Sequence, residues 1–244
     1  MSLRKYPPLV ITTAVSTGDV PYVGMTDSDE RINKYLKSID VWLKKIPDIQ
    51  IVLCDGTGFD WNILIDQRYN KQQFECLTCF NDVSKVEKFG KGYGEIEILN
   101  HVVDNSKMVQ KARHFMKITG KYWIDNIAEF SNKELFSNFK CKSIFKISSW
   151  SLLYINTVFF SCSVVTYRQY FYESYKLVND HTGNDLEHVM AQLITEYNIR
   201  DYQFIHAPVI RGWSGTGNHA IDLTSKSIKD KLRTIKYWVL SFLL

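Results

Sequence analysis

The residues best suited to chemistry lie between positions 90 and 126 of the chain. This stretch begins with alternating glycines around one lysine: Gly90, Lys91, Gly92 and Gly94. A loop of this composition lets its backbone amides approach an anion closely. We expect a helix from about Glu95, followed further on by a short apolar run that ends in Asp125 and Asn126. Glycine loop, helix, strand and acid is the order in which α/β folds build phosphate and cation sites at the carboxyl ends of their strands.

The glycine loop matches neither of the two common phosphate motifs. The dinucleotide fingerprint places its glycines directly after a strand and its acid about twenty residues later. A P-loop needs Ser or Thr after Gly-Lys, whereas Gly92 follows Lys91 here. A flexible surface turn with a solvated lysine therefore stays open as the alternative interpretation.

The composition is that of an ordinary globular protein. With 244 residues the chain can bury a sizeable core, as one large α/β domain or as one and a half small ones. The net charge of +4 is mild, and the 30 Lys and Arg residues are spread along the chain. A dedicated nucleic-acid binder concentrates its charge, so we expect no nucleic-acid partner.

The cysteines favour a reducing compartment. There are five of them, an odd number. Cys76 and Cys79 form a single C-x-x-C pair without the second pair of a structural zinc site. Cys54 and Cys162 lie in apolar runs, which is typical of buried thiols. The N-terminus has charge and proline where a secretory signal has an apolar core, so we expect a cytoplasmic protein.

The first half of the chain shows the hydrophobic patterns of a parallel sheet. Apolar runs predict strands at 9–15, 49–54, 75–80 and 122–124. Helical patterns lie at 27–46, where Pro47 ends the helix, at 95–103, and after Ser106. Strand, helix and strand with short connections form a right-handed βαβ unit. We therefore expect an α/β fold whose mostly parallel Rossmann-type sheet is flanked by helices.

Beyond Phe130 the patterns indicate a mixed or antiparallel second half. Runs of β-branched and aromatic residues predict strands at 144–147, 154–160 and 164–167, and apolar spacing predicts a helix at 185–197. We expect one domain over 1–224, with a first half at 9–130 and a second half at 131–224.

The segment 225–244 forms an amphipathic C-terminal tail with a basic side. It is too short and too charged to span a bilayer. It is predicted either to lie on an anionic membrane surface, at the inner face of the membrane, or to pack on the protein itself.

Four segments together resemble bacterial surface-polysaccharide glycosyltransferases of the GT-A type. They are the run 31–43, the strand end Cys54-Asp55-Gly56-Thr57-Gly58, the glycine loop, and the Lys117-Ile118-Thr119-Gly120-Lys121-Tyr122 strand. The resemblance covers 10–217, and the order of these short motifs carries most of its weight. It implies an enzyme that moves a sugar from a nucleotide-diphosphate donor to a hydroxyl of a carbohydrate or lipid-linked acceptor.

The resemblance also implies a donor site, position by position. Thr13 and Ser16, after the first strand, would lie beside the base or ribose, and Asp55 would accept a hydrogen bond from either. Lys91, with Gly92 next to it, would face the diphosphate or lie near the donor sugar.

Asp125 falls where the resemblance places an Asp-x-Asp metal motif, but Asn126 follows it and the second carboxylate is missing. The diphosphate leaving group needs its developing charge balanced. Asp125 and Asn126 could hold Mg²⁺ or Mn²⁺ through oxygen ligands. Cationic residues such as Lys91 and Arg211 could equally replace the metal, and a simple turn after a strand is the third interpretation.

For the base that removes the acceptor proton, the resemblance points to the start of a late helix, where Asp185 and Glu187 lie. The competing interpretation is structural. Asn184 with Glu187 has the spacing of a capping box, and acids favour the first turn of a helix.

A glycine-rich segment follows, from Arg211 through Ser214 to Asn218. Its cation and indole suit a loop that closes over a diphosphate and a sugar, although an ordinary loop has the same composition. His206 and His219 flank it as possible late metal ligands.

Two other functions compete with sugar transfer. A sugar-nucleotide nucleotidyltransferase also needs a glycine-lysine phosphate loop on a parallel sheet, but normally has it directly after the first strand, where this chain has none. The missing second carboxylate after Asp125 keeps a non-catalytic carbohydrate-binding relative open as the other alternative.

Overall fold

The computed structural model describes residues 5–16, 24–146, 151–214 and 219–221. The main sheet has six strands in the order β3-β2-β1-β4-β7-β6, and a second sheet has three in the order β5-β8-β9. Within the main sheet β1 to β4 are parallel, whereas β7 is antiparallel to both β4 and β6. The predicted fold class is confirmed: an α/β protein with a mostly parallel sheet and a mixed second half.

The main sheet is formed by β1 (Leu9–Thr13), β2 (Ile51–Asp55), β3 (Phe74–Thr78), β4 (His114–Thr119), β6 (Phe139–Lys146) and β7 (Ser151–Ser163). The small sheet is formed by β5 (Tyr122–Ile124), β8 (Ile210–Trp213) and β9 (Ala220–Ile221). The α-helices are α1 (Ser28–Lys45), α2 (Asn62–Arg68), α3 (Val83–Phe89), α4 (Lys91–Asn105), α5 (Lys107–Ala112), α6 (Asn132–Leu135), α7 (Val164–Thr166) and α8 (Leu186–Glu196). Short helical turns are η1 (Lys71–Gln73), η2 (Ile127–Glu129), η3 (Tyr167–Phe171), η4 (Tyr172–Lys176) and η5 (Asp180–Thr182).

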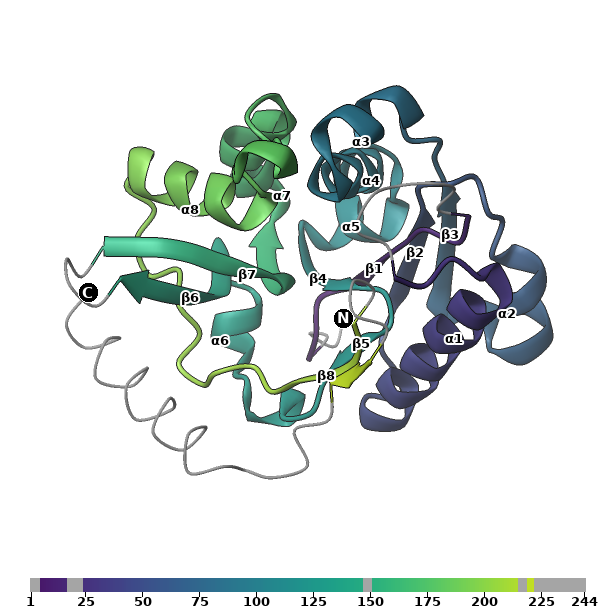
Figure 1. The fold of residues 1–244 in the computed structure, drawn as a ribbon. Coiled ribbons are helices and arrows are strands. Elements are labelled where there is room, and N and C mark those ends of the chain that lie inside the picture. The colour runs from purple at the N-terminus through teal and green to yellow at the C-terminus, as the bar shows by residue number, and fades with distance from the viewer. Residues whose placement is uncertain (1–4, 17–23, 147–150, 215–218, 222–244) are drawn as a thin grey trace.

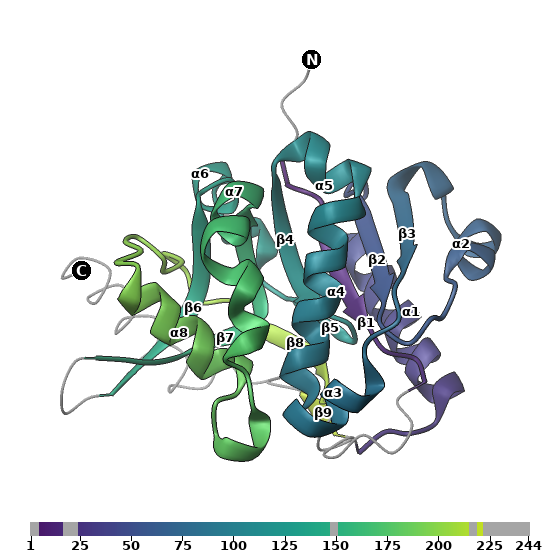
Figure 2. The ribbon, with the colours of Figure 1, turned by 90° about the horizontal axis from the view of Figure 1, so that it is seen from above.

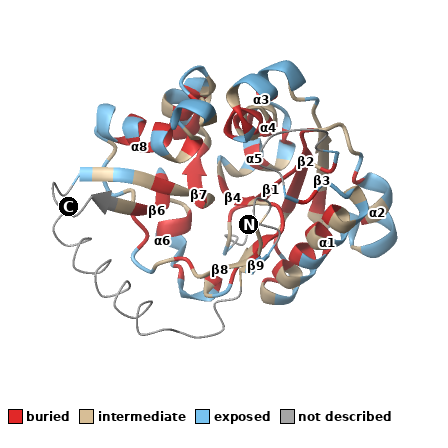
Figure 3. Cartoon of the chain, viewed as in Figure 1, coloured by how far each residue is buried: buried red, intermediate tan, exposed pale blue. Residues whose placement is uncertain are grey.

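The main sheet lies between two layers and buries both of its faces. Helices α3, α4, α5, α7 and α8 cover one face, and α1 with the small sheet covers the other (Figures 1 and 2). Alternate strand residues enter opposite cores: Val10 packs with α4 and α8, while Leu9 and Ile11 pack with α1. The central strands are therefore buried almost throughout (Figure 3). The continuous apolar runs of the sequence follow from this arrangement.

Helix α1 illustrates how local sequence produces the predicted elements. Asp27 caps its first turn, because the Asp27 side chain accepts a hydrogen bond from the Glu30 amide at 2.7 Å. Its buried stripe includes Tyr35, Ile39 and Trp42. The helix runs from the carboxyl end of β1 toward the start of β2, and the βαβ prediction is confirmed.

The apolar run after residue 113 forms two strands in two sheets, and the predicted strand at 122–124 is confirmed as the second of them. β4 belongs to the main sheet and β5 to the small one. Gly120 and Lys121 form the turn between them, and Lys121 has a φ of 74°. A Cβ at Gly120 would lie 2.4 Å from the Tyr35 ring and 2.7 Å from the Thr12 carbonyl oxygen. Only glycine fits there, so the chain can reverse tightly against α1.

Two further boundaries differ from prediction. The expected strand at 164–167 is α7 and the start of η3, because Ser163 caps a helical turn by accepting the Thr166 amide at 3.0 Å. Helix α4 starts at Lys91, four residues before the expected position, so Gly92 and Gly94 lie in its first turn. The helix predicted at 185–197 is confirmed as α8.

The main sheet continues across the boundary expected near residue 130, because β4 pairs with β7. Within the described residues, no helix is both long and apolar enough to cross a bilayer. The tail predicted at 225–244 lies outside the described residues.

Candidate active site

The parallel strands end together at one edge of the main sheet, and two predicted residues lie there. Asp55 is fully buried at the end of β2. Its Oδ2 accepts hydrogen bonds from Thr13 Oγ1 at 2.8 Å and the Val15 amide at 3.0 Å, and its Oδ1 accepts from Thr57 at 2.7 and 2.5 Å. The Phe59 amide donates a further bond to Oδ1 at 3.2 Å. An enclosed carboxylate with five donors cannot also accept from a nucleotide, so the expected direct contact by Asp55 is wrong.

Thr13 is enclosed in the same network. Its hydroxyl donates to Asp55 and accepts from Trp61 Nε1 at 3.0 Å, and the residue is 2% exposed. The Thr13 hydroxyl therefore serves this network, and its predicted place beside the base or ribose stays a prediction. Ser16, by contrast, is exposed just beyond β1, where its amide donates to Thr57 Oγ1 at 3.1 Å. The hydrogen bonds of Asp55 and Thr13 thus hold together the chain segments at the carboxyl edge, where Ser16 lies.

A polar group that the sequence analysis did not identify lies at the same edge, on the face covered by α4. Lys117, in β4, has no exposed surface, yet its ammonium lies 2.6 Å from Glu95 Oε1 of α4. The same Oε1 accepts hydrogen bonds from Thr12 at 3.0 Å and Thr119 at 2.9 Å. Among the hydrogen bonds of the described residues, none ends on Glu95 Oε2, and the Glu95 side chain is 20% exposed. One carboxylate oxygen is therefore available to a ligand.

This group extends across the sheet to α8. Lys117 Nζ also donates to the Thr157 carbonyl of β7 at 2.6 Å, and the Thr157 hydroxyl donates to Glu187 Oε1 at 2.6 Å. Two glutamates from different helices are thus joined through Lys117 and Thr157. The carboxyl-edge cluster, as it is named below, consists of Thr12, Glu95, Lys117, Thr119, Thr157 and Glu187.

The pKa values of the two glutamates in the cluster are shifted in opposite directions. Burial opposes ionisation of Glu95, but the adjacent Lys117 charge and three hydrogen bonds outweigh it, so the Glu95 pKa lies below its ordinary value. Burial raises the Glu187 pKa, the Thr157 hydrogen bond opposes this in part, and the Glu95 charge adds to the rise. Neighbouring carboxyls with divergent pKa values are typical of acid–base sites.

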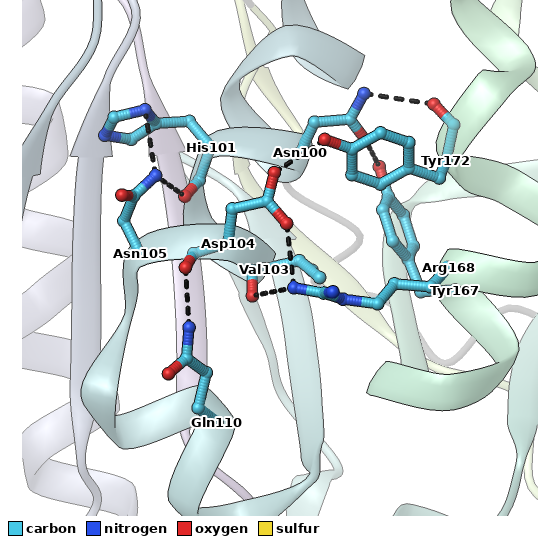
Figure 4. Close-up of polar contacts among 9 residues, drawn as sticks. All are labelled: Asn100, His101, Val103, Asp104, Asn105, Gln110, Tyr167, Arg168 and Tyr172. Atoms are coloured by element: carbon cyan, nitrogen blue, oxygen red, sulfur yellow. Dashed lines mark hydrogen bonds and ion pairs between the residues drawn. The ribbon is translucent and has the colours of Figure 1, made fainter.

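Helix α4 is tied to the helical turns between β7 and α8, and this fixes Glu95 relative to Glu187. Asn100 of α4 accepts from the Tyr167 hydroxyl at 3.0 Å and donates to the Tyr172 carbonyl at 3.0 Å. Asp104 pairs with Arg168 at 2.8 Å and accepts from the Tyr172 hydroxyl at 2.6 Å (Figure 4). These contacts therefore join the two halves of the chain along α4, from Asn100 to Asp104.

Asp185 and Glu187, the two predicted base candidates, have separate roles. Asp185 is the N-cap of α8: its Oδ1 accepts from the His188 amide at 3.0 Å and contacts His188 Nδ1 at 2.7 Å. The expected capping box from Asn184 to Glu187 is wrong, because the cap lies one residue later. Because Asp185 serves as the cap, Glu187 is not needed for it, and the Glu187 side chain points toward Thr157.

The glycine-rich loop does not form the expected anion cradle. The first turn of α4 faces Asp180 of η5, and Asp180 Oδ2 accepts from the Gly92 amide at 3.3 Å. A Cβ at Gly90, where φ is 98°, would lie 2.3 Å from that same oxygen. The glycines therefore let the chain around Asp180 pack closely, and an internal carboxylate occupies the helix N-terminus. Lys91 is exposed beside it, so its predicted diphosphate role lacks the loop on which it rested.

Asp125 lies away from the carboxyl edge, contrary to expectation. β5 runs along α1 toward the end of that helix, where Lys45 Nζ donates to the Asp125 carbonyl at 2.8 Å and to Oδ1 at 3.0 Å. Since α1 ends beside the start of β2, Asp125 lies toward the amino ends of the parallel strands. Asp125 follows the wrong strand for the expected metal motif, because the strand that ends at the site is β4.

Asn126 and Arg211 accompany Asp125. Asn126 Oδ1 accepts from the Val209 amide at 2.8 Å, and its amide group donates to the Ala207 carbonyl at 3.2 Å. Arg211 Nε lies 3.9 Å from Asp125 Oδ2. These contacts join β5 to the segment before β8, so Asn126 and Arg211 do not reach the donor edge. Ser214 comes directly after β8, where its amide donates to the His219 carbonyl at 2.9 Å.

The described residues at the end of β4 do not fit a divalent cation held by a carboxylate pair, as the resemblance implies. Over the described ranges, no three His, Cys, Asp or Glu side chains come together. The residues that follow β4 are Gly120 and Lys121, and a lysine repels Mg²⁺ or Mn²⁺. His206 and His219 are both exposed.

One signal in the sequence could have revealed the cluster. Lys117 lies in the middle of a buried apolar strand, and a fully buried lysine needs a carboxylate partner. Glu95 was the acid available at the start of the neighbouring helix. Lys121 gave no such signal, because a lysine after Gly120 looks like an ordinary turn residue.

No protein-family model matches the chain, and no curated protein matches it in sequence. Similar solved structures include a protein of Desulfovibrio desulfuricans described as a nucleotide-diphospho-sugar transferase, at 6% identity and a TM-score of 0.47, over 82% of this chain and 80% of that one. The glycosyltransferase GlyE of Streptococcus pneumoniae is similar at 8% identity and a TM-score of 0.48, over 81% of this chain and 44% of GlyE. HddC of Yersinia pseudotuberculosis is similar at 14% identity and a TM-score of 0.34, over 72% and 79% of the two chains. The first two are described as sugar transferases.

Proposed function

We propose that this chain is a glycosyltransferase that moves a sugar from a nucleotide-diphosphate donor to an acceptor hydroxyl. The observation that supports it most is the carboxyl-edge cluster, in which Glu95 and Glu187 converge at the end of β4 with divergent pKa values. Ligands of open α/β sheets bind at the carboxyl ends of the strands, and the cluster lies there.

Glu187 is the proposed base. A carboxylate whose pKa is raised accepts a proton more readily than an ordinary glutamate, and burial gives Glu187 this property. It takes the proton of the acceptor hydroxyl while the oxygen bonds to the anomeric carbon of the donor. The bond from that carbon to the diphosphate breaks, and the nucleoside diphosphate leaves with the electron pair. Attack from the face opposite the leaving group inverts the anomeric centre.

Glu95 is proposed to position the sugar. Lys117, Thr12 and Thr119 all bond to its Oε1, so the carboxylate is held ionised and in place while Oε2 stays available. An ionised, fixed acceptor suits a hydrogen bond from a sugar hydroxyl and not proton removal, because its pKa is lowered. The acceptor belongs to a polysaccharide or glycan pathway in this proposal, as the resemblance implies.

A panel of nucleoside-diphosphate sugars tests the proposal in two readouts. Donor binding raises the melting temperature of the folded chain, and release of nucleoside diphosphate reports turnover to added saccharides or to water. Glu187→Gln should keep the thermal shift while turnover falls by about 10²-fold or more, because the amide preserves shape but cannot take a proton. Asp185→Asn is the matched variant, and it should keep both readouts.

Three results would contradict the proposal. Formation of a nucleotide sugar from a nucleoside triphosphate and a sugar phosphate would make the chain a nucleotidyltransferase. A thermal shift without turnover on any donor would make it a binding protein. Full turnover by Glu187→Gln would place the base elsewhere.

A further inference from the structure

A second lysine lies at the same edge, on the face covered by α1. Lys121 follows Gly120 directly after β4, beside the end of β1. Its backbone is held in place, because its carbonyl accepts from the Trp213 amide at 3.1 Å and its φ is 74°. The turn therefore presents this side chain at a defined position where β1 and β4 end.

Lys121 is buried without a carboxylate. It is 4% exposed, and among the described residues no Asp or Glu oxygen lies within 4 Å of its ammonium. Its ammonium lies 5.7 Å from the centre of the Tyr35 ring. Glu30, whose charge raises the Lys121 pKa, forms its own ion pair with Lys34 at 4.0 Å. Because a buried ammonium is costly unless paired, this arrangement is poised for an anion.

Arg31 places a second buried cation beside Lys121. It is 5% exposed, and its guanidinium donates to the Ala14 carbonyl at 2.6 Å, the Met25 carbonyl at 2.8 Å and the Tyr35 hydroxyl at 3.1 Å. These partners are uncharged, so the positive charge of Arg31 remains. Burial, and after it the Arg31 charge, lowers the Lys121 pKa to about 8.

The surroundings add more positive charge. Lys34 and Lys37 of α1 lie over the Trp213 ring, with their ammonium groups 4.1 and 4.4 Å from its centre. Trp213 contacts the Lys121 backbone, so both lysines belong to the same neighbourhood. Positive charge therefore gathers on this side of the edge, while the carboxylates of Glu95 and Glu187 lie on the other.

We propose that Lys121, supported by Arg31, binds the diphosphate of the donor and takes the place of a divalent metal ion. This inference rests on the proposed function, and it assigns the part of the site that the glycine loop and Asp125 were expected to supply. The ammonium balances the negative charge that grows on the diphosphate as the bond to the sugar breaks. The sugar then extends over the ends of β1 and β4 toward the carboxyl-edge cluster.

The test measures binding of UDP, GDP, UMP, GMP and inorganic pyrophosphate by calorimetry, in EDTA and again with Mn²⁺. At least one nucleoside diphosphate should bind in EDTA. Lys121→Met should weaken that binding about 10- to 100-fold, as expected for loss of a charged hydrogen bond. The matching nucleoside monophosphate should lose much less, because the lysine contacts the diphosphate. A general loss of structure would affect both ligands equally.

Three variants frame the result. Lys121→Arg should restore most of the affinity, because it retains the cation. Lys111→Met, in an exposed lysine of α5 at the opposite edge of the sheet, should bind like the unmodified chain. Lys91→Met tests the rival position, and a larger loss there than at Lys121 would overturn the proposal.

Two other outcomes would also overturn it: binding that occurs only with Mn²⁺, or equal affinity of Lys121→Met for the diphosphate. The outcome is independent of Glu187, which makes failure of the two proposals distinguishable. If Lys121→Met binds normally while Glu187→Gln loses turnover, sugar transfer stands and the diphosphate assignment fails. If diphosphate binding depends on Lys121 but no donor is turned over, the anion site stands and the transferase function fails.

Discussion

Lys117 lies within β4 and Lys121 follows the strand four residues later, and both are buried. The Lys117 ammonium contacts Glu95 at 2.6 Å and completes two further hydrogen bonds. Lys121 contacts the Tyr35 ring and, within the described part of the chain, no carboxylate. A buried charge with an internal partner maintains the fold. A buried charge left without one costs stability, and proteins accept that cost where a ligand supplies the partner.

The contrast predicts that removing the Lys117 charge lowers the stability of the fold and that removing the Lys121 charge raises it. Lys117→Met should lower the free energy of unfolding by about 3–5 kcal/mol, because it leaves the Glu95 carboxylate buried beside an apolar side chain. Urea unfolding at neutral pH measures the change. Adding Glu95→Gln to this variant should recover part of the loss, since no unpaired charge then remains. A loss below about 1 kcal/mol would show that Lys117 is not held by its pairing.

The next effect is expected at Glu187, which is linked to Lys117 through Thr157. Glu187→Gln should lower turnover by about 10²-fold, equivalent to about 2.7 kcal/mol in the barrier. Because burial raises the Glu187 pKa above its ordinary 4.5, the acid limb of the pH–rate profile should lie above that value. The raised pKa penalises the charged form in the fold, so Glu187→Gln should also be slightly more stable at neutral pH. A rate that is flat down to pH 4.5 would contradict the assignment.

Lys121→Met should stabilise the free protein, in contrast to Lys117→Met. The Lys121 pKa is lowered from 10.5 to about 8, so the fold disfavours the charged form. This penalty is fully present below pH 8, shrinks as the pH rises toward 10.5, and vanishes above it. Removing the charge should therefore add up to about 3 kcal/mol at pH 7 and nothing near pH 11. Stabilisation that does not vary with pH would indicate a packing effect.

The smallest effect is expected at Asp125, because its ion pair with Lys45 is exposed, unlike the pair of Lys117 with Glu95. Lys45 and Asp125 lie 3.0 Å apart, with side chains 26% and 48% exposed. Asp125→Asn should cost about 0–1 kcal/mol of stability and leave donor binding unchanged. Loss of Mn²⁺-stimulated donor binding in this variant would show that Asp125 holds the metal ion, as the resemblance implies.

The fold was largely predictable, and the site only in part. The β1–α1–β2 unit follows from continuous apolar strands and a helical stripe ending at Pro47. The division of residues 114–124 between two sheets depends on the contact of Gly120 with Tyr35, which no local pattern reveals. That one turn places Asp125 away from the carboxyl edge and Lys121 at it.

Tertiary contacts also decide what the residues at the starts of α4 and α8 do. Asp185 and Glu187 look alike in sequence, but Thr157 of β7 separates them, because it is the partner that only Glu187 reaches. The glycines before α4 suit an anion loop, yet Asp180, distant in sequence, fills that place. Residue types indicated the chemistry, and long-range packing decided which residues can perform it.

The most direct measurement is the pKa of Lys121 itself, followed by NMR of the lysine side chains with Lys121→Met to assign the signal. In the free protein the Lys121 pKa should lie near 8. Saturation with a nucleoside diphosphate in EDTA should raise it to the ordinary 10.5 or above, because the anion stabilises the ammonium. A pKa already at 10.5 in the free protein, or one that does not change on saturation, would contradict the account.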